Sequence, residues 1–262
     1  MSQSTISVSP EKILDANIFG YNLGITNTML TALIVCMFIV LLGLILGIIL
    51  PKNKDIKPNK IQTFIEMIGE GLYNFITPMI NGRKISLALF SLCGFFFSYI
   101  VFASWFGLLP GVGQLYTKSG EGNLVHLFRA STTDLAGTAV LSIIAFVLIQ
   151  FQGIRELKLG YLSKFINFKS PMGFAVGLLE LISELSRLLS FALRLFGNIF
   201  AGEVMLKIVG DMSRFGIERL GFLGLPFPSV IIALEIFVAL IQAYVFVALF
   251  LVFSSLAKEE AH

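Results

Sequence analysis

The chain has 262 residues, of which 56% are hydrophobic and only 13% are charged. Soluble domains carry about 25% charged residues, so this chain has too little charge to cover a surface that faces water. These values exclude a soluble globule, and the net charge of +3 is too small to indicate a nucleic-acid partner.

Three apolar runs in the first part of the chain are candidates for crossing a bilayer. A transmembrane helix needs about 20 apolar residues. Residues 28–50 and 85–109 meet this length, and residues 135–151 form the shortest run. Residues 1–17 lack the basic and apolar pattern of a cleavable signal peptide, and we expect residues 1–27 to form an outer N-terminal segment.

A shorter segment, residues 61–80, lies between the first and second runs and has the pattern of an amphipathic helix. Apolar residues recur at helical spacing, with Glu66, Glu70 and Asn74 between them. We expect this helix to lie in the membrane interface or against a partner protein. Residues 85–152 then form the second and third crossings, joined by an outer loop rich in Gly, Ser, Thr and charge.

The C-terminal region, residues 171–256, predicts a long helical hairpin. Its first arm, residues 171–208, is interrupted by charged and polar side chains, whereas its second arm, residues 226–256, is more uniformly apolar. At about 1.5 Å per residue both arms are longer than a straight crossing requires, so we expect them to be tilted. The predicted fold is an all-α, polytopic membrane protein with about five transmembrane helices.

Basic residues are divided unevenly between the two sides of this arrangement. Five crossings place the termini on opposite sides, and the side that holds the tail, residues 257–262, carries more Lys and Arg. The positive-inside rule therefore predicts a cytoplasmic C-terminus and an outer N-terminus.

The first arm of the hairpin carries polar residues that are costly in lipid. A charge at mid-membrane costs about 2.5–3.5 kcal/mol. On a helical wheel with about 100° per residue, five polar residues share one face along roughly 27 Å. They are Glu180, Glu184, Arg187, Arg194 and Asn198. Glu180 and Glu184 can also be read as charges near the interface, and Arg187 as snorkelling or paired with Glu184.

Arg194 is the least easily explained of these residues. An arginine cannot be deprotonated in a protein, so it cannot avoid the cost by becoming neutral. No acid of the chain is placed by the sequence pattern to pair with it. We therefore expect its partner to belong to another subunit.

A second polar group lies near the outer end of the hairpin. Glu203 falls on a different flank of the first arm, and Glu235 and Gln242 share a face of the second arm. In an antiparallel hairpin, Glu203 and Glu235 both lie toward the outer end and could line one cavity. Gln242 lies closer to the level of Arg194, and a simple hydrogen bond to a neighbouring helix explains it equally well.

Three stretches of the chain resemble subunit a of the rotary F-type ATP synthases. They are residues 193–203 (LRLFGNIFAGE), residues 234–246 and residues 128–134 (FRASTTD). The resemblance covers the chain from Asn27 onward in order and spacing. The combination of the motif around Arg194 with that around Gln242 makes it highly specific.

The resemblance implies a stator subunit beside a rotating ring of c subunits, each with a buried carboxylate. Two offset aqueous half-channels would pass protons to and from that carboxylate, so that ion flow drives rotation and ATP synthesis. Arg194 would favour the ionised rotor carboxylate and repel a proton leaking directly between the half-channels. The resemblance places Asn198, Glu203, Glu235 and Gln242 at the outer half-channel or beside the arginine, and Glu180 and Glu184 at the inner one. In the common family pattern one of the positions held here by Glu203 and Glu235 is His.

The resemblance also implies partners and a location. The partners would be the c-subunit ring, the b-subunit peripheral stalk and, indirectly, the soluble catalytic head, in a bacterial plasma (inner) membrane or, alternatively, a mitochondrial inner membrane. The chain has no phosphate-binding loop, so we expect no nucleotide binding, no catalysis by the chain alone and no cofactor. Its cysteines, Cys36 and Cys93, and its histidines, His126 and His262, form no metal-ligand pattern.

Two other functions are compatible with a polytopic fold. A secondary transporter could use an intramembrane arginine for an anionic substrate, but the sequence lacks an internal repeat and helices broken by Gly or Pro at mid-span. A structural scaffold without ion conduction has no use for a polar stripe that nearly spans the hydrocarbon.

Overall fold

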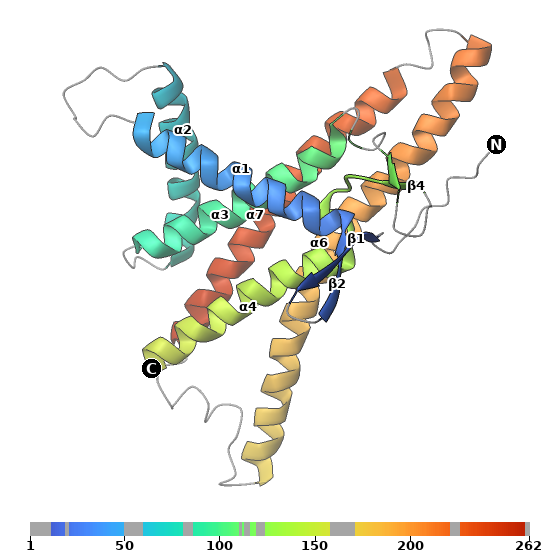
Figure 1. Cartoon of the computed structure of the whole chain (residues 1–262). Helices are drawn as coiled ribbons and strands as arrows, with labels where there is room; N and C mark the ends of the chain where they lie inside the picture. The colour runs from blue at the N-terminus through green and yellow to red at the C-terminus, as the bar shows by residue number, and fades with distance from the viewer. Residues whose placement is uncertain are drawn as a thin grey trace. The chain divides into compact units, whose positions relative to one another are not determined.

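A computed structural model describes residues 12–18, 21–49, 60–80, 86–109, 112, 116–118, 124–157, 171–220 and 226–259. The prediction of an all-α, polytopic membrane protein is confirmed (Figure 1). The helices are α1 (Asn27–Ile49), α2 (Lys60–Ile76), α3 (Leu87–Leu108), α4 (Leu135–Leu157), α6 (Pro171–Leu220) and α7 (Pro226–Glu259). Short 3-10 turns follow α2 at Thr77–Ile80 and precede α4 at Ser131–Thr133.

Four helices of the described part of the chain are long and apolar enough to cross a membrane. Their apolar spans are Asn27–Ile45, Leu87–Leu108, Leu135–Arg155 and Pro228–Ala257. Helix α6 is not among these four, although its 50 residues make it about 75 Å long. A fifth crossing by α6 therefore stays a prediction.

Two short hairpins of antiparallel strands occur where the sequence indicated only an outer segment and a loop. Strands β1 (Lys12–Ile18) and β2 (Tyr21–Thr26) pair just before α1, with Ile18 opposite Tyr21. Strands β3 (Tyr116–Lys118) and β4 (Leu124–His126) pair between α3 and α4. Strand pairing satisfies the backbone N–H and C=O groups of these segments. Their mixed composition shows no alternation of polar and apolar residues, so the sequence did not predict the strands.

The described residues fall into two compact units. The first combines residues 1–35, 100–143 and 187–242, and the second combines residues 36–99, 144–186 and 243–262. Each unit contains parts of α1, α3, α4, α6 and α7, because these long helices pass from one unit into the other.

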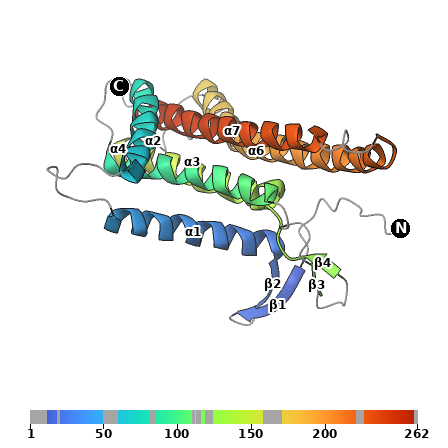
Figure 2. The same ribbon diagram turned by 90° about the horizontal axis from the view of Figure 1, so that it is seen from above.

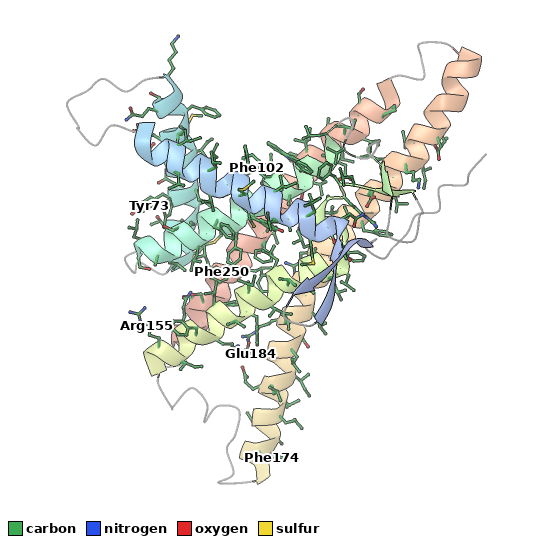
Figure 3. The ribbon with its side chains drawn as sticks, in the orientation of Figure 1. Tyr73, Phe102, Arg155, Phe174, Glu184 and Phe250 are labelled. Atoms are coloured by element: carbon green, nitrogen blue, oxygen red, sulfur yellow. The ribbon has the colours of Figure 1, made fainter. Side chains whose placement is uncertain are left out.

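Aromatic packing builds the core of the second unit. The ring of Phe96 on α3 lies 5.5 Å from that of Phe246 and 5.2 Å from that of Phe250 on α7. Phe250, labelled in Figure 3, is fully buried. Helix α2 joins this core through Phe75, whose ring centroid lies 3.8 Å from that of Tyr244. These contacts attach the amphipathic helix to α7.

In the first unit, a buried acid fixes the start of α4. The two carboxyl oxygens of Asp134 accept hydrogen bonds from the backbone N–H of Ala136 (3.2 Å) and from the hydroxyl of Thr28 on α1 (3.3 Å). A carboxylate at a helix N-terminus satisfies an otherwise unpaired N–H group and favours the helix dipole. Gly137 lets the preceding 3-10 turn approach closely, since an added Cβ would lie 2.1 Å from the carbonyl oxygen of Ser131. The segment before α4 is therefore held tightly against its first turn.

Candidate functional site

Arg194 lies on α6 with its side chain exposed. One guanidinium nitrogen donates a hydrogen bond of 3.1 Å to the hydroxyl of Ser190, one turn earlier on the same helix. Among the described residues, no carboxylate forms an ion pair with this guanidinium. The expectation that the partner of Arg194 belongs to another subunit stays a prediction.

Gln242 fixes α7 against α6 at the level of Arg194. Its side chain is 4% exposed, and its Nε2 donates a 2.9 Å hydrogen bond to the backbone carbonyl oxygen of Arg194. Figure 2 shows the later part of α6 lying alongside the first part of α7. Hydrogen bonds between membrane helices contribute about 0.6–2 kcal/mol. Gln242 therefore positions the backbone that carries the arginine, and its amide donor points into the helix pair.

Asn198 continues the exposed side of α6 beyond Arg194. Ser190, Arg194 and Asn198 follow one another at intervals of four residues, and all three are exposed. Residues four apart lie on the same side of a helix. The neighbouring residues Leu195 and Ile199 are buried, with 2% and 7% exposed. Helix α6 thus presents a polar side that the described part of the first unit leaves uncovered.

Glu235 of α7 lies against α6 at Gly202, the residue before Glu203. The carboxyl group of Glu235 rests on Gly202, because a Cβ added there would lie 1.4 Å from its Oε1. Glu203 is the next residue along α6. Trp105 of α3 donates a 3.4 Å hydrogen bond to the carbonyl oxygen of Ile236, adjacent to Glu235. Glycine at position 202 therefore makes room for the acid of α7.

Arg129 joins this pair from the segment before α4. Its Nη2 lies 3.5 Å from Oε2 of Glu203, and its Nε donates a 3.2 Å hydrogen bond to Thr133 Oγ1. Arg129 was not among the site residues predicted from the sequence. The only signal that pointed to it is its position inside residues 128–134, one of the three stretches that carry the family resemblance.

Glu184, in the second unit, is covered by α4. Its side chain, labelled in Figure 3, is 3% exposed, and its Oε2 accepts a 3.1 Å hydrogen bond from Nε2 of Gln150. Glu180 and Arg187, by contrast, are half-buried. The residues predicted to share one polar stripe therefore differ in their surroundings, since Glu184 lies under α4 while Arg194 and Asn198 are exposed. Helical spacing alone did not reveal Gln150 as the partner of Glu184.

Replacing Gly202 with alanine is expected to destabilise the contact between α6 and α7 by about 1–3 kcal/mol, the usual cost of overpacking. The new methyl group cannot share its place with the Glu235 carboxyl, so that side chain must move. The thermal unfolding temperature of the purified protein measures the effect. The matched control is Gly210→Ala, also on α6, where an added Cβ meets nothing within 4 Å. Equal unfolding temperatures for the two variants would contradict the close approach at Gly202.

Comparison with known proteins shows the family of the chain and relatives among curated proteins. The family model described as "ATP synthase A chain" matches residues 29–255. The chain is similar to a protein of Desulfotalea psychrophila named "ATP synthase subunit a", with 36% identity over 213 residues. The matched region covers 80% of this chain and 77% of the relative.

Proposed function

The chain belongs to the ATP synthase A chain family, and we propose which of its residues pass protons to and from the rotor. It is the proton-conducting stator subunit of the membrane sector, a transport subunit that has no catalytic site of its own. The exposed guanidinium of Arg194 is the observation on which the assignment of residues rests.

The side of α6 that carries Arg194 and Asn198 faces the rotor ring. A charged side chain within the hydrocarbon costs about 2.5–3.5 kcal/mol when it stands alone. Arg194 is exposed and makes no ion pair within the described part of its own chain. An anionic group on a neighbouring subunit removes that cost. The rotor carboxylate supplies this anion each time a c subunit passes.

The fixed charge of Arg194 separates two proton paths. Next to the guanidinium a rotor carboxylate is favoured in its ionised form, so it releases its proton before it passes. The same positive charge repels a proton that would cross directly from one path to the other. Each charge that moves down 100 mV yields about 2.3 kcal/mol, and the ring converts this free energy into rotation.

The outer path uses the acids at the contact of α6 and α7. Glu203 and Glu235 exchange protons between the outer solution and the rotor carboxylate, and Asn198 and Gln242 flank the arginine. The closeness of Glu235 to Gly202, and hence to Glu203, supports this assignment. The inner path uses Glu180 and Glu184, of which Glu180 is the more accessible and Glu184 is hydrogen-bonded to Gln150.

Membership of the ATP synthase complex implies partners in both its membrane and soluble sectors. The c-subunit ring lies against the Arg194 side of α6. The b-subunit peripheral stalk contacts other membrane surfaces of the chain, and the soluble catalytic head is reached only through the stalk. The chain lies in a bacterial plasma membrane with its C-terminus in the cytoplasm, as its basic residues favour.

A cysteine at position 198 is expected to form a disulfide with a cysteine introduced beside the rotor carboxylate. Asn198 is exposed on the proposed rotor side, whereas Ile199, the next residue, is 7% exposed and faces the interior. Mild oxidation of membranes followed by electrophoresis without reductant measures the cross-linked dimer. The native cysteines, Cys36 and Cys93, are first replaced with alanine so that only the new thiols react.

The matched control is Ile199→Cys in the same background. We expect a high yield of dimer for Asn198→Cys and little for Ile199→Cys, because the second thiol points into the helix pair. Equal yields, or a dimer for Ile199→Cys alone, would show that another side of α6 meets the rotor.

A further inference from the structure

We propose that Arg129 is the positioning residue for Glu203 and that it holds this carboxylate beside Glu235 throughout the transport cycle. The inference rests on the proposed role of Glu203 in the outer proton path. Arg129 does not itself carry a proton here, since a guanidinium keeps its charge in proteins. Its effect on proton flow is exerted through the orientation of Glu203.

The backbone on both sides of Arg129 is fixed to the end of α3. The ring of Phe128 lies edge-on to that of Phe106, with centroids 6.0 Å apart and planes at 84°. Ala130 is 5% exposed and lies against Gly107, where an added Cβ would lie 2.7 Å from the Ala130 Cβ. The residues before and after Arg129 are therefore packed on consecutive residues of one helix, which leaves the arginine backbone little freedom.

The side chain of Arg129 is also held in place. Its Nε donates to Thr133 Oγ1, and that hydroxyl in turn donates a 2.8 Å hydrogen bond to the carbonyl oxygen of Ala130. The terminal nitrogen Nη2 of the same guanidinium contacts Glu203 on α6. The Arg129 side chain is 11% exposed, whereas that of Glu203 is 41% exposed. The Arg129 side chain is thus held in place, and it orients the more accessible side chain of Glu203.

The position of this ion pair explains why the site needs a cation. Glu235 lies against Gly202, the residue before Glu203 on α6, and two neighbouring carboxylates repel each other when both are ionised. A permanent positive charge 3.5 Å from Glu203 offsets part of this repulsion. The Arg129 guanidinium also keeps the Glu203 carboxylate in one orientation, so that Glu203 passes its proton to the same neighbouring group in every cycle.

The test uses the intact complex in membranes, with ATP-driven proton pumping and passive proton flow as readouts. Arg129→Gln is expected to lower both rates about tenfold, the scale of coupling energies within one salt-bridge network. Arg129→Lys keeps the charge and is expected to recover most of the loss. The double variant Arg129→Gln/Glu203→Gln is expected to be no slower than Glu203→Gln alone. The matched control, Arg155→Gln, removes an exposed arginine of α4 (Figure 3) and should leave the rates unchanged.

Three results would overturn the inference. They are unchanged rates in Arg129→Gln, rates as low in Arg129→Lys as in Arg129→Gln, and losses that multiply in the double variant. Wild-type rates in Glu203→Gln would instead overturn the proposed outer path itself, so the two failures are distinguishable. If Arg129→Gln does not assemble, the exchange Arg129→Glu/Glu203→Arg decides. Rates in the exchange variant above those of Arg129→Glu alone support the ion pair, and rates that do not rise overturn it.

Discussion

Replacing Arg194 with alanine is expected to abolish ATP-driven proton pumping in inverted membrane vesicles, while the soluble head still hydrolyses ATP. The rotor carboxylate then meets no cation as it passes and keeps its proton. Removing one partner of a buried charge pair costs about 3–5 kcal/mol, which corresponds to a loss of more than about a hundredfold in rate. Quenching of a pH-sensitive dye measures pumping, and phosphate release measures hydrolysis.

The control for this experiment is Arg155→Ala, which also removes an exposed arginine but near the end of α4. It should pump at the wild-type rate. Immunoblots of the membranes verify that both variants assemble in equal amounts. Undiminished pumping in Arg194→Ala would remove the arginine from the mechanism, and with it the assignment of the rotor side of α6.

Replacing both Glu203 and Glu235 with glutamine is expected to stop proton flow through the outer path almost completely. Each single variant should retain part of the activity, because the remaining acid still accepts and releases protons. The double variant has no titratable carboxyl at the contact between Gly202 and Glu235. Loss of a positioned acid–base group typically costs about a hundredfold or more. The combined loss should therefore exceed the product of the two single losses.

Passive proton flow after removal of the soluble head measures this effect without requiring ATP hydrolysis. Glu70→Gln is a matched control, because Glu70 is an exposed acid on α2. Wild-type flow in the double variant would exclude both acids from the path. Losses that simply multiply would show that the two carboxyls act independently.

The apolar pattern of the sequence predicts most of the helices, because a membrane helix needs a continuous apolar run. The predicted run 28–50 differs from α1 (Asn27–Ile49) by one residue at each end. The segment 61–80 covers all but the first residue of α2 (Lys60–Ile76), together with the short 3-10 turn that follows it. Local composition sets these elements, so they can be read without knowledge of the neighbouring helices.

The contacts within the site could not be predicted in the same way, because they join residues that are distant in the sequence. Arg129 and Glu203 are 74 residues apart, and Gln150 and Glu184 are 34 apart. A helical wheel places Glu184 on the same side as Arg194, yet α4 covers only the first of these two residues. Tertiary packing decides which residues of a polar helix side are buried. The helical spacing of polar residues in the sequence does not predict that packing.

The role of Gly202 was likewise hidden. A glycine in a helix ordinarily costs about 1 kcal/mol relative to alanine, and within an apolar segment it indicates only that a neighbour approaches closely. The structure identifies that neighbour as the carboxyl group of Glu235 on α7. A residue without a side chain is thus as important for the pair of acids as the acids themselves.

The hydrogen bond from Gln242 ends on the main-chain oxygen of residue 194 and not on its guanidinium. Every amino acid presents that same oxygen, so the attachment of α7 is indifferent to the side chain carried there. Position 194 can therefore accept an unnatural residue, such as one bearing a nitrile group, without loss of this attachment. The stretching frequency of such a group would report the local electric field as successive rotor subunits go by.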